Sequence, residues 1–220
     1  MGDKVESIDP GQIVILNGAP RAGKSSIVAV IQETFDGPWM SFGVDVARQT
    51  TPPRYQPGIG LRPGEADHQA APFVPTFYAA WYESIAAHSR AGLNVVVDVG
   101  HHEETILAES ARRLEGLPVL FVGVHCPIEV IMERRNAGQP GREGGYAVST
   151  RDDPVPAPVR LWQHRVHIPG IYDLEVDTSV LSPEECAEAI RRRLQGSPPS
   201  AFRQLAQLPA AGHENLPSRL

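Results

Sequence analysis

The spacing G-x-x-x-x-G-K-S, typical of loops that bind nucleotide phosphates, occurs at Gly18-Ala19-Pro20-Arg21-Ala22-Gly23-Lys24-Ser25. Glycine lets such a loop adopt positive φ angles, so that several backbone N–H groups converge on one point. Lys24 adds a positive charge for the β- and γ-phosphates, and the Ser25 hydroxyl can ligate Mg²⁺. We therefore expect ATP and Mg²⁺ to be bound by Gly18, Ala19, Pro20, Arg21, Ala22, Gly23, Lys24, Ser25 and Ser26.

The flanking sequence supplies the elements that this loop needs. An apolar run at residues 13–16 predicts a buried strand before it. The periodic apolar positions Ile27, Val28, Ile31 and Phe35 predict a helix after it, over residues 25–35. The helix N-terminus adds positive potential for the phosphates.

Two carboxylates follow apolar runs that read as strands. Asp45 ends the segment 40–45, and Asp98 ends the run that begins at Leu93. The carboxyl ends of parallel strands meet at one edge of a sheet, so both should lie beside the phosphate loop. Asp45 is the candidate general base for an acceptor hydroxyl, and Asp98 together with Ser25 is the candidate Mg²⁺ site. Either aspartate could instead cap a turn or a helix.

Three arginines could contact a transferring phosphoryl group. Arg134 and Arg135 end a predicted helix, and Arg142 lies in a glycine-rich stretch beyond it. Guanidinium groups match phosphate oxygens, so this region is predicted to form a lid over the triphosphate, with Arg134 and Arg142 as catalytic residues. The alternative, favoured for Arg135 alone, is a solvated basic helix end.

Adjacent His101 and His102 lack the spacing of a zinc helix but could border the acceptor pocket.

Strands and helices alternate along the rest of the chain. Strands are predicted at 119–124 and 172–176, and helices at 77–90, 103–114, 127–135 and 182–194, the last opened by a Ser182–Glu185 capping box. The pattern predicts an α/β fold with a parallel sheet covered on both faces. Residues 50–76 and 136–158 are expected to be loops. We expect an extension at 1–10, a catalytic domain at 11–195, and a disordered or extended tail at 196–220.

Composition narrows the possible partners. A formal net charge of −6 over 220 residues disfavours general nucleic-acid binding. Two cysteines without a motif disfavour a disulfide framework, and no stretch is apolar enough for a signal peptide or a membrane span. A cytoplasmic protein with a small-molecule partner is expected, of unknown oligomeric state. Aromatic residues between 50 and 82 would suit an apolar acceptor, although Phe77 and Trp81 at i, i+4 spacing more simply pack their helix onto the sheet.

Several segments, taken together, resemble the chloramphenicol phosphotransferase family. They are residues 15–26, Pro38-Trp39 with Phe42-Gly43-Val44-Asp45, residues 122–126 with Glu133-Arg134-Arg135, and residues 172–178. The resemblance spans residues 11–195. It implies a P-loop kinase fold with a five-stranded parallel sheet and a lid, transfer of the γ-phosphate of ATP to a hydroxyl as in antibiotic inactivation, and Asp45 as the catalytic carboxylate. Pro20 and Arg21 are bulkier than the family's usual loop residues.

The leading hypothesis is therefore a small-molecule O-phosphotransferase. Two alternatives stay open at this point. One is a metabolite kinase of the shikimate, gluconate or nucleotide type, which would share the loop and lid. The other is a nucleotide-sensing module that binds ATP without turning it over.

Overall fold

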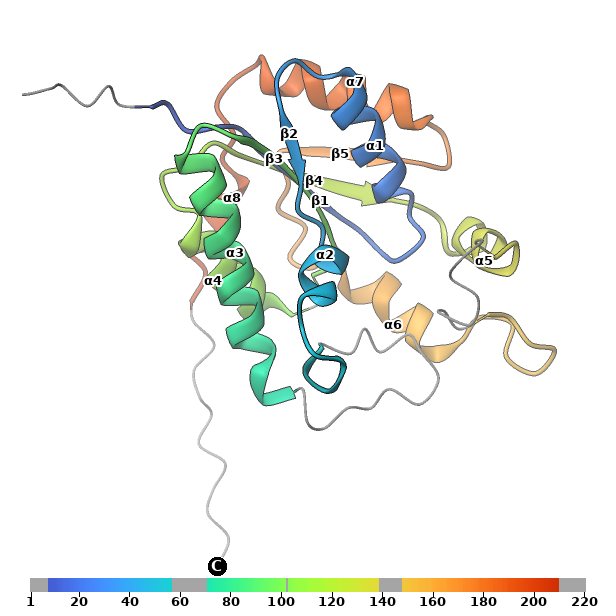
Figure 1. Cartoon of the computed structure of the whole chain (residues 1–220). Coiled ribbons are helices and arrows are strands. Elements are labelled where there is room, and N and C mark those ends of the chain that lie inside the picture. The colour runs from blue at the N-terminus through green and yellow to red at the C-terminus, as the bar shows by residue number, and fades with distance from the viewer. Residues whose placement is uncertain (1–7, 57–70, 102, 139–147, 210–220) are drawn as a thin grey trace, which may run out of the picture.

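A computed structural model describes residues 8–56, 71–101, 103–138 and 148–209 (Figure 1). Within these residues, five parallel strands form one sheet in the order β2-β3-β1-β4-β5. They are β1 (Ile13–Asn17), β2 (Trp39–Ser41), β3 (Asn94–Val99), β4 (Val119–His125) and β5 (Leu174–Asp177). The predicted five-stranded parallel sheet is confirmed.

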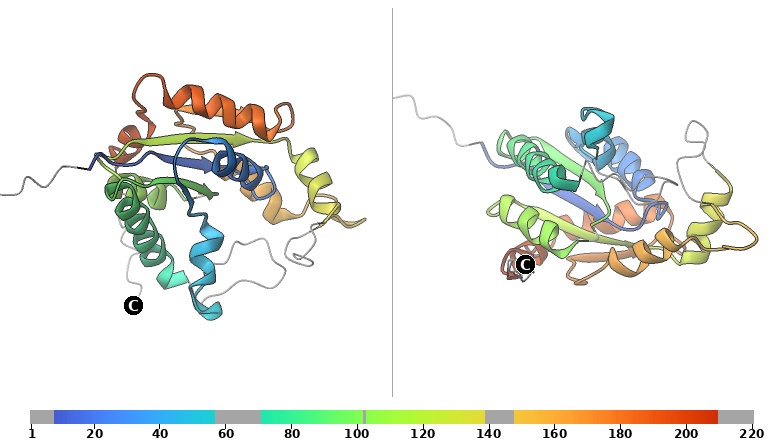
Figure 2. Two further views of the ribbon diagram at one scale, coloured as in Figure 1. Left: turned by 45° about the horizontal axis from the view of Figure 1, so that its top comes forward. Right: turned by 90° about the horizontal axis from the view of Figure 1, so that it is seen from below.

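Helices cover both faces of this sheet. The first face packs against α1 (Lys24–Thr34), α5 (Ile128–Asn136), α6 (Ala157–Arg165) and α7 (Pro183–Leu194). The second packs against α3 (Val74–Arg90), α4 (Glu104–Arg113) and α8 (Ala201–Ala206). The left view of Figure 2 shows α7 and α3 on opposite sides of the sheet.

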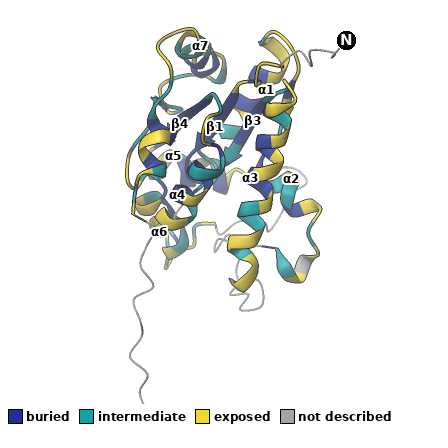
Figure 3. Ribbon diagram, turned by 90° about the vertical axis from the view of Figure 1, so that its left-hand side faces the viewer, coloured by how far each residue is buried: buried dark blue, intermediate teal, exposed yellow. Residues whose placement is uncertain are grey.

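The central strand shows how the sequence produces two cores. All five residues of β1 are buried, and they alternate between the faces. Val14 and Leu16 join the first core, whereas Ile13 and Ile15 join the second. Figure 3 shows the burial of β1, β3 and β4. Burial on both faces explains why this strand reads as a continuous apolar run rather than an alternating one.

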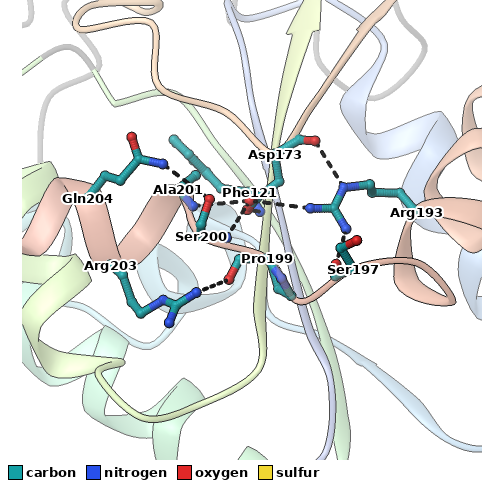
Figure 4. A network of polar contacts seen from close by, with 9 residues as sticks. All are labelled: Phe121, Asp173, Arg193, Ser197, Pro199, Ser200, Ala201, Arg203 and Gln204. Carbon is teal, nitrogen blue, oxygen red and sulfur yellow. Dashed lines mark hydrogen bonds and ion pairs between the residues drawn. The ribbon is translucent and has the colours of Figure 1, made fainter.

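The expectation of a disordered or extended tail is wrong for its first part. Residues 201–206 form α8, which buries Ala201, Phe202 and Leu205 against the second face of the sheet. The side chain of Asp173, only 1% exposed, anchors this helix by accepting hydrogen bonds from the backbone N–H groups of Ser200 (2.6 Å), Ala201 (3.0 Å) and Phe121 (3.0 Å) (Figure 4). Residues 210–220 lie outside the described part of the chain.

Two further helices were not predicted. The expected strand at 40–45 is shorter than proposed, because β2 ends at Ser41 and α2 (Val44–Gln49) begins after Gly43. α6 begins at Ala157, inside the predicted loop at 136–158, and buries Val159 and Trp162. Two short 3₁₀ turns, η1 (Pro53–Tyr55) and η2 (Ala71–Phe73), flank residues outside the described ranges. None of the described helices combines the length and apolar character that crossing a membrane requires.

Candidate active site

The predicted phosphate loop joins β1 to α1 in the expected strand–loop–helix order. Arg21 and Gly23 have positive φ angles of 74° and 94°, which curve the loop around its own backbone. The Lys24 ammonium lies inside this curve and donates to the carbonyl oxygens of Gly18 (2.7 Å) and Ala19 (2.9 Å). A cavity of about 430 Å³ opens beside the loop, lined by Arg21, Gly23, Lys24, Ser25, Ser26, Ile27, Arg134, Thr178, Leu181 and Pro183.

Burial and nearby carboxylates have opposite effects on the pKa of Lys24. Burial lowers its pKa to about 8, and the carboxylates of Asp98 and Asp45 oppose that shift. Because β3 lies between β2 and β1, the segments that follow β2 and β1 flank the end of β3, where Asp98 lies. The sheet order therefore brings together residues that are far apart in sequence.

Asp98 links the phosphate loop to the turn after β2. Its Oδ2 accepts a hydrogen bond from the Ser25 hydroxyl at 2.7 Å. Its Oδ1 faces Gly43 so closely that a Cβ atom built there would lie only 1.8 Å away. A hydroxyl and a carboxylate oxygen are the hard donors that Mg²⁺ prefers, so Ser25 and Asp98 fit the expected metal. Among the described residues no group of three His, Cys, Asp or Glu side chains could hold a metal unaided.

Asp45 lies in the first turn of α2 rather than at the end of a strand. Its Oδ1 accepts a hydrogen bond from Arg48 Nη1 at 3.3 Å. Arg48 is only 7% exposed, and its Nη2 donates to Gln56 Oε1, also at 3.3 Å. Gln56 in turn donates to the backbone oxygens of Arg48 and Thr51, both at 2.9 Å, which closes the segment after α2. Asp45 is therefore held by its own helix and by the loop that follows it.

The turn before Asp45 is fixed from the opposite side by α3. Trp81 Nε1 donates to the carbonyl oxygen of Phe42 at 3.1 Å, and the Trp81 ring is buried. The prediction that Trp81 packs its helix onto the sheet is confirmed, whereas Phe77 is half-buried against Tyr78. Burial raises the pKa of Tyr78 to about 12, with a further contribution from Glu103 and an opposing one from Arg48.

Arg134 is the member of the predicted arginine group that lines the cavity. Its Nη2 donates to the Thr178 carbonyl oxygen at 2.7 Å, and its Nη1 donates to Thr178 Oγ1 at 3.1 Å. Thr178 directly follows β5 and also donates to Ala22 O of the phosphate loop at 2.7 Å. Arg135 is instead buried within α5, so it is not a solvated helix end. Arg142 lies outside the described residues.

Buried polar groups fix the strand that precedes the loop. Asn17, 1% exposed, donates through Nδ2 to Tyr172 OH and Val166 O, both at 2.8 Å, and accepts from the His101 N–H at 2.8 Å. His101 is buried, and its Nε2 lies 2.5 Å from Tyr82 OH. It therefore links the end of β3 to α3. His102 lies outside the described residues.

Comparisons with known proteins agree with this geometry. The sequence profile of the family described as "Chloramphenicol phosphotransferase-like protein" matches residues 11–195. The chain belongs to this family. It is therefore a phosphotransferase of the P-loop kinase class, acting on a hydroxyl group.

Individual relatives are more distant. A protein of Mycobacterium tuberculosis (strain H37Rv), named "Putative O-phosphotransferase Rv2636", is 28% identical over 210 residues, which cover 89% of this chain and 88% of the relative. The M. tuberculosis APS kinase CysC, solved with AMPPNP and APS, superposes with a TM-score of 0.59 at 17% identity, over 85% of this chain and 99% of that one. Shikimate kinase from Acinetobacter baumannii gives 0.55 at 13% identity, over 86% and 96%. At these identities the two structures show the P-loop kinase fold alone.

Four site residues escaped sequence reasoning as functional candidates: Asn17, Arg48, Gln56 and Thr178. Thr178 could have been found, because it comes two residues after the predicted strand at 172–176 and so must lie at the same edge as the loop. Arg48 and Gln56 gave no such signal, since their roles depend on how residues 49–56 fold back onto α2.

Proposed function

We propose that the protein transfers the γ-phosphate of ATP to a hydroxyl of a small molecule, with Mg²⁺ bound to the nucleotide. The observation that supports this most directly is that Asp98 contacts both Ser25 in the phosphate loop and the turn at Gly43, which leads to Asp45. Phosphoryl transfer requires a cradle for phosphate oxygens, oxygen donors for the metal and a carboxylate for the acceptor. The chain supplies one residue type for each of these tasks.

In the proposed reaction, Asp45 orients the acceptor hydroxyl and accepts its proton. The acceptor oxygen forms a bond to the γ-phosphorus, the bond from that phosphorus to the β–γ bridging oxygen breaks, and ADP leaves. Lys24 and Arg134 stabilise negative charge on the moving phosphoryl group. Ser25 and Asp98 would hold Mg²⁺, which neutralises charge on the β- and γ-phosphates when bound.

The acceptor is proposed to approach from the side of α2 and α3. Phe42, Val44, Ala47 and Tyr78 are partly buried against the second core. We propose that their exposed parts offer apolar and aromatic surface to the acceptor. Such surface suits a hydroxylated organic molecule with an apolar body. The family name makes chloramphenicol and other hydroxylated antibiotics the first acceptors to test, with hydroxylated metabolites beside them.

The test is mass spectrometry of candidate alcohols incubated with the protein, ATP and Mg²⁺. Transfer adds about 80 Da, the increment of one phosphoryl group, to one of them. Asp45→Asn should abolish the product while leaving MgATP binding in place. Asp36→Asn is the matched control, because Asp36 is an exposed carboxylate in the segment between α1 and β2. Full activity of Asp45→Asn would refute the assignment of the base, and ATP binding without any transfer would favour a nucleotide sensor.

A further inference from the structure

Arg21 has a backbone conformation that is strained for any residue with a side chain. Its φ of 74° is the left-handed region, and among the described residues no other non-glycine has a positive φ. Glycine adopts this region freely, whereas other residues keep it only where their surroundings fix them there. An arginine at this position therefore calls for a compensating role of its side chain.

The Arg21 side chain extends to the C-terminal end of α5. Its Nη2 donates to the carbonyl oxygens of Arg134 and of Gly138, the latter at 3.0 Å. Carbonyl groups in the last turn of a helix lack intrahelical partners, and the helix dipole favours a cation beside them. Arg21 thus ties the phosphate loop to the end of α5, although 113 residues separate Arg21 from Arg134.

Arg134 returns the contact. Its Nη1 donates to the Arg21 carbonyl oxygen at 3.3 Å, in addition to its bonds to Thr178. The guanidinium lies against the loop, since a Cβ atom at Gly23 would be 3.5 Å from Arg134 Nη1. We call this pair of contacts the Arg21–Arg134 brace. It joins two arginines that both line the same cavity.

Two cations held close together repel each other and favour an anion between or beside them. The brace fixes both in advance, so the nucleotide does not have to order them when it binds. We propose that Arg21 is a positioning residue for nucleotide binding: it acts through Arg134, whose guanidinium it keeps against the phosphate loop. This inference rests on the proposed nucleotide site and extends it.

Arg21→Gly is the decisive variant, because glycine tolerates the left-handed φ and removes only the side chain. Titration calorimetry with Mg-AMPPNP should show affinity weakened about tenfold, the size of one charge-assisted hydrogen bond. The thermal midpoint should stay unchanged or rise. Arg21→Lys should recover part of the affinity, since one ammonium cannot reproduce the planar fork of the guanidinium. Arg192→Ala removes an exposed positive charge from α7 and serves as the control for net charge.

A double-mutant cycle tests the route of the effect. If Arg21 acts through Arg134, adding Arg21→Gly to Arg134→Met should change the Mg-AMPPNP affinity by less than about twofold. Wild-type affinity in Arg21→Gly would overturn the proposal. A full tenfold loss added to Arg134→Met would also overturn it, because Arg21 would then contact the nucleotide independently. A wild-type protein that does not bind Mg-AMPPNP would instead refute the proposed nucleotide site.

Discussion

Replacing Gly43 by alanine should displace Asp98 without removing any functional group. Gly43 has φ −60° and ψ 156°, which alanine adopts without strain. The added Cβ, however, would lie 1.8 Å from Asp98 Oδ1, and real Cβ atoms essentially never come closer than 3.0 Å to another heavy atom. The carboxylate or the turn must therefore move by about 1.2 Å even to reach that limit.

A displacement of this size should disrupt the proposed metal site. The 2.7 Å bond from Ser25 to Asp98 Oδ2 cannot keep its geometry if the carboxylate moves away from Gly43. A misplacement of about 1 Å in a catalytic arrangement typically costs about a hundredfold in rate. We expect phosphoryl transfer to fall by about that factor, and the Mg²⁺ concentration for half-maximal rate to rise.

The assay is the rate of ADP formation with a phosphorylated acceptor, measured across a Mg²⁺ titration. Gly196→Ala is the matched control, because a Cβ there meets its nearest atom at an ordinary 3.4 Å. Circular dichroism and thermal unfolding establish that the Gly43 variant is folded. A folded Gly43→Ala protein with the wild-type rate and Mg²⁺ dependence would refute both the placement of Asp98 and its role.

Three other outcomes are expected. Because Arg48 orients Asp45, Arg48→Met should lower kcat about tenfold while the KM for ATP stays within about twofold. Arg48→Lys should keep most of the rate. Equal losses of rate in the two variants would contradict this role. Burial lowers the pKa of Lys24 to about 8, and bound phosphates should raise it. Calorimetry should therefore show an MgATP affinity that is constant below about pH 8 and falls above it. The Lys24→Arg variant should show no such fall. Asp173→Ala should lower the free energy of unfolding in urea by about 3 kcal/mol, because three backbone N–H groups lose their acceptor. Asp173→Asn should lower it less. Wild-type stability of the alanine variant would show that α8 is not anchored by Asp173.

The central part of the fold could be predicted because local signals and the global architecture agree. The run at residues 13–16, the glycine spacing of the loop and the helix after it each indicate the same unit. The capping box at Ser182 is present as expected, with Glu185 N–H donating to Ser182 Oγ at 3.2 Å and Glu185 accepting from the Ser182 N–H at 2.8 Å. The parallel strand order then brings Asp98 to the loop, where it accepts a hydrogen bond from Ser25, whereas Asp45 lies in the first turn of α2 rather than at a strand end.

The unpredicted helices depend on contacts that the local sequence does not reveal. α8 has six residues, too few for a stable isolated helix, and it forms because Asp173 caps its first N–H groups and the sheet buries Phe202. α2 is equally short and is held by Arg48 and Gln56. Short helices stabilised by distant residues leave little periodicity in the sequence, so their segments read as loops.

The site also shows why Asp98 is more than a metal-binding candidate. One of its oxygens is bonded to Ser25 in the phosphate loop, and the other lies against Gly43, two residues before Asp45. One carboxylate on the strand between them thus sets the proposed nucleotide side and the proposed acceptor side relative to each other. In-line transfer requires that relation to be fixed, because the acceptor oxygen, the γ-phosphorus and the leaving oxygen must be aligned. A residue larger than glycine at position 43 should therefore prevent the reaction without removing any functional group, since it would displace Asp98 and change the distance between the two half-sites.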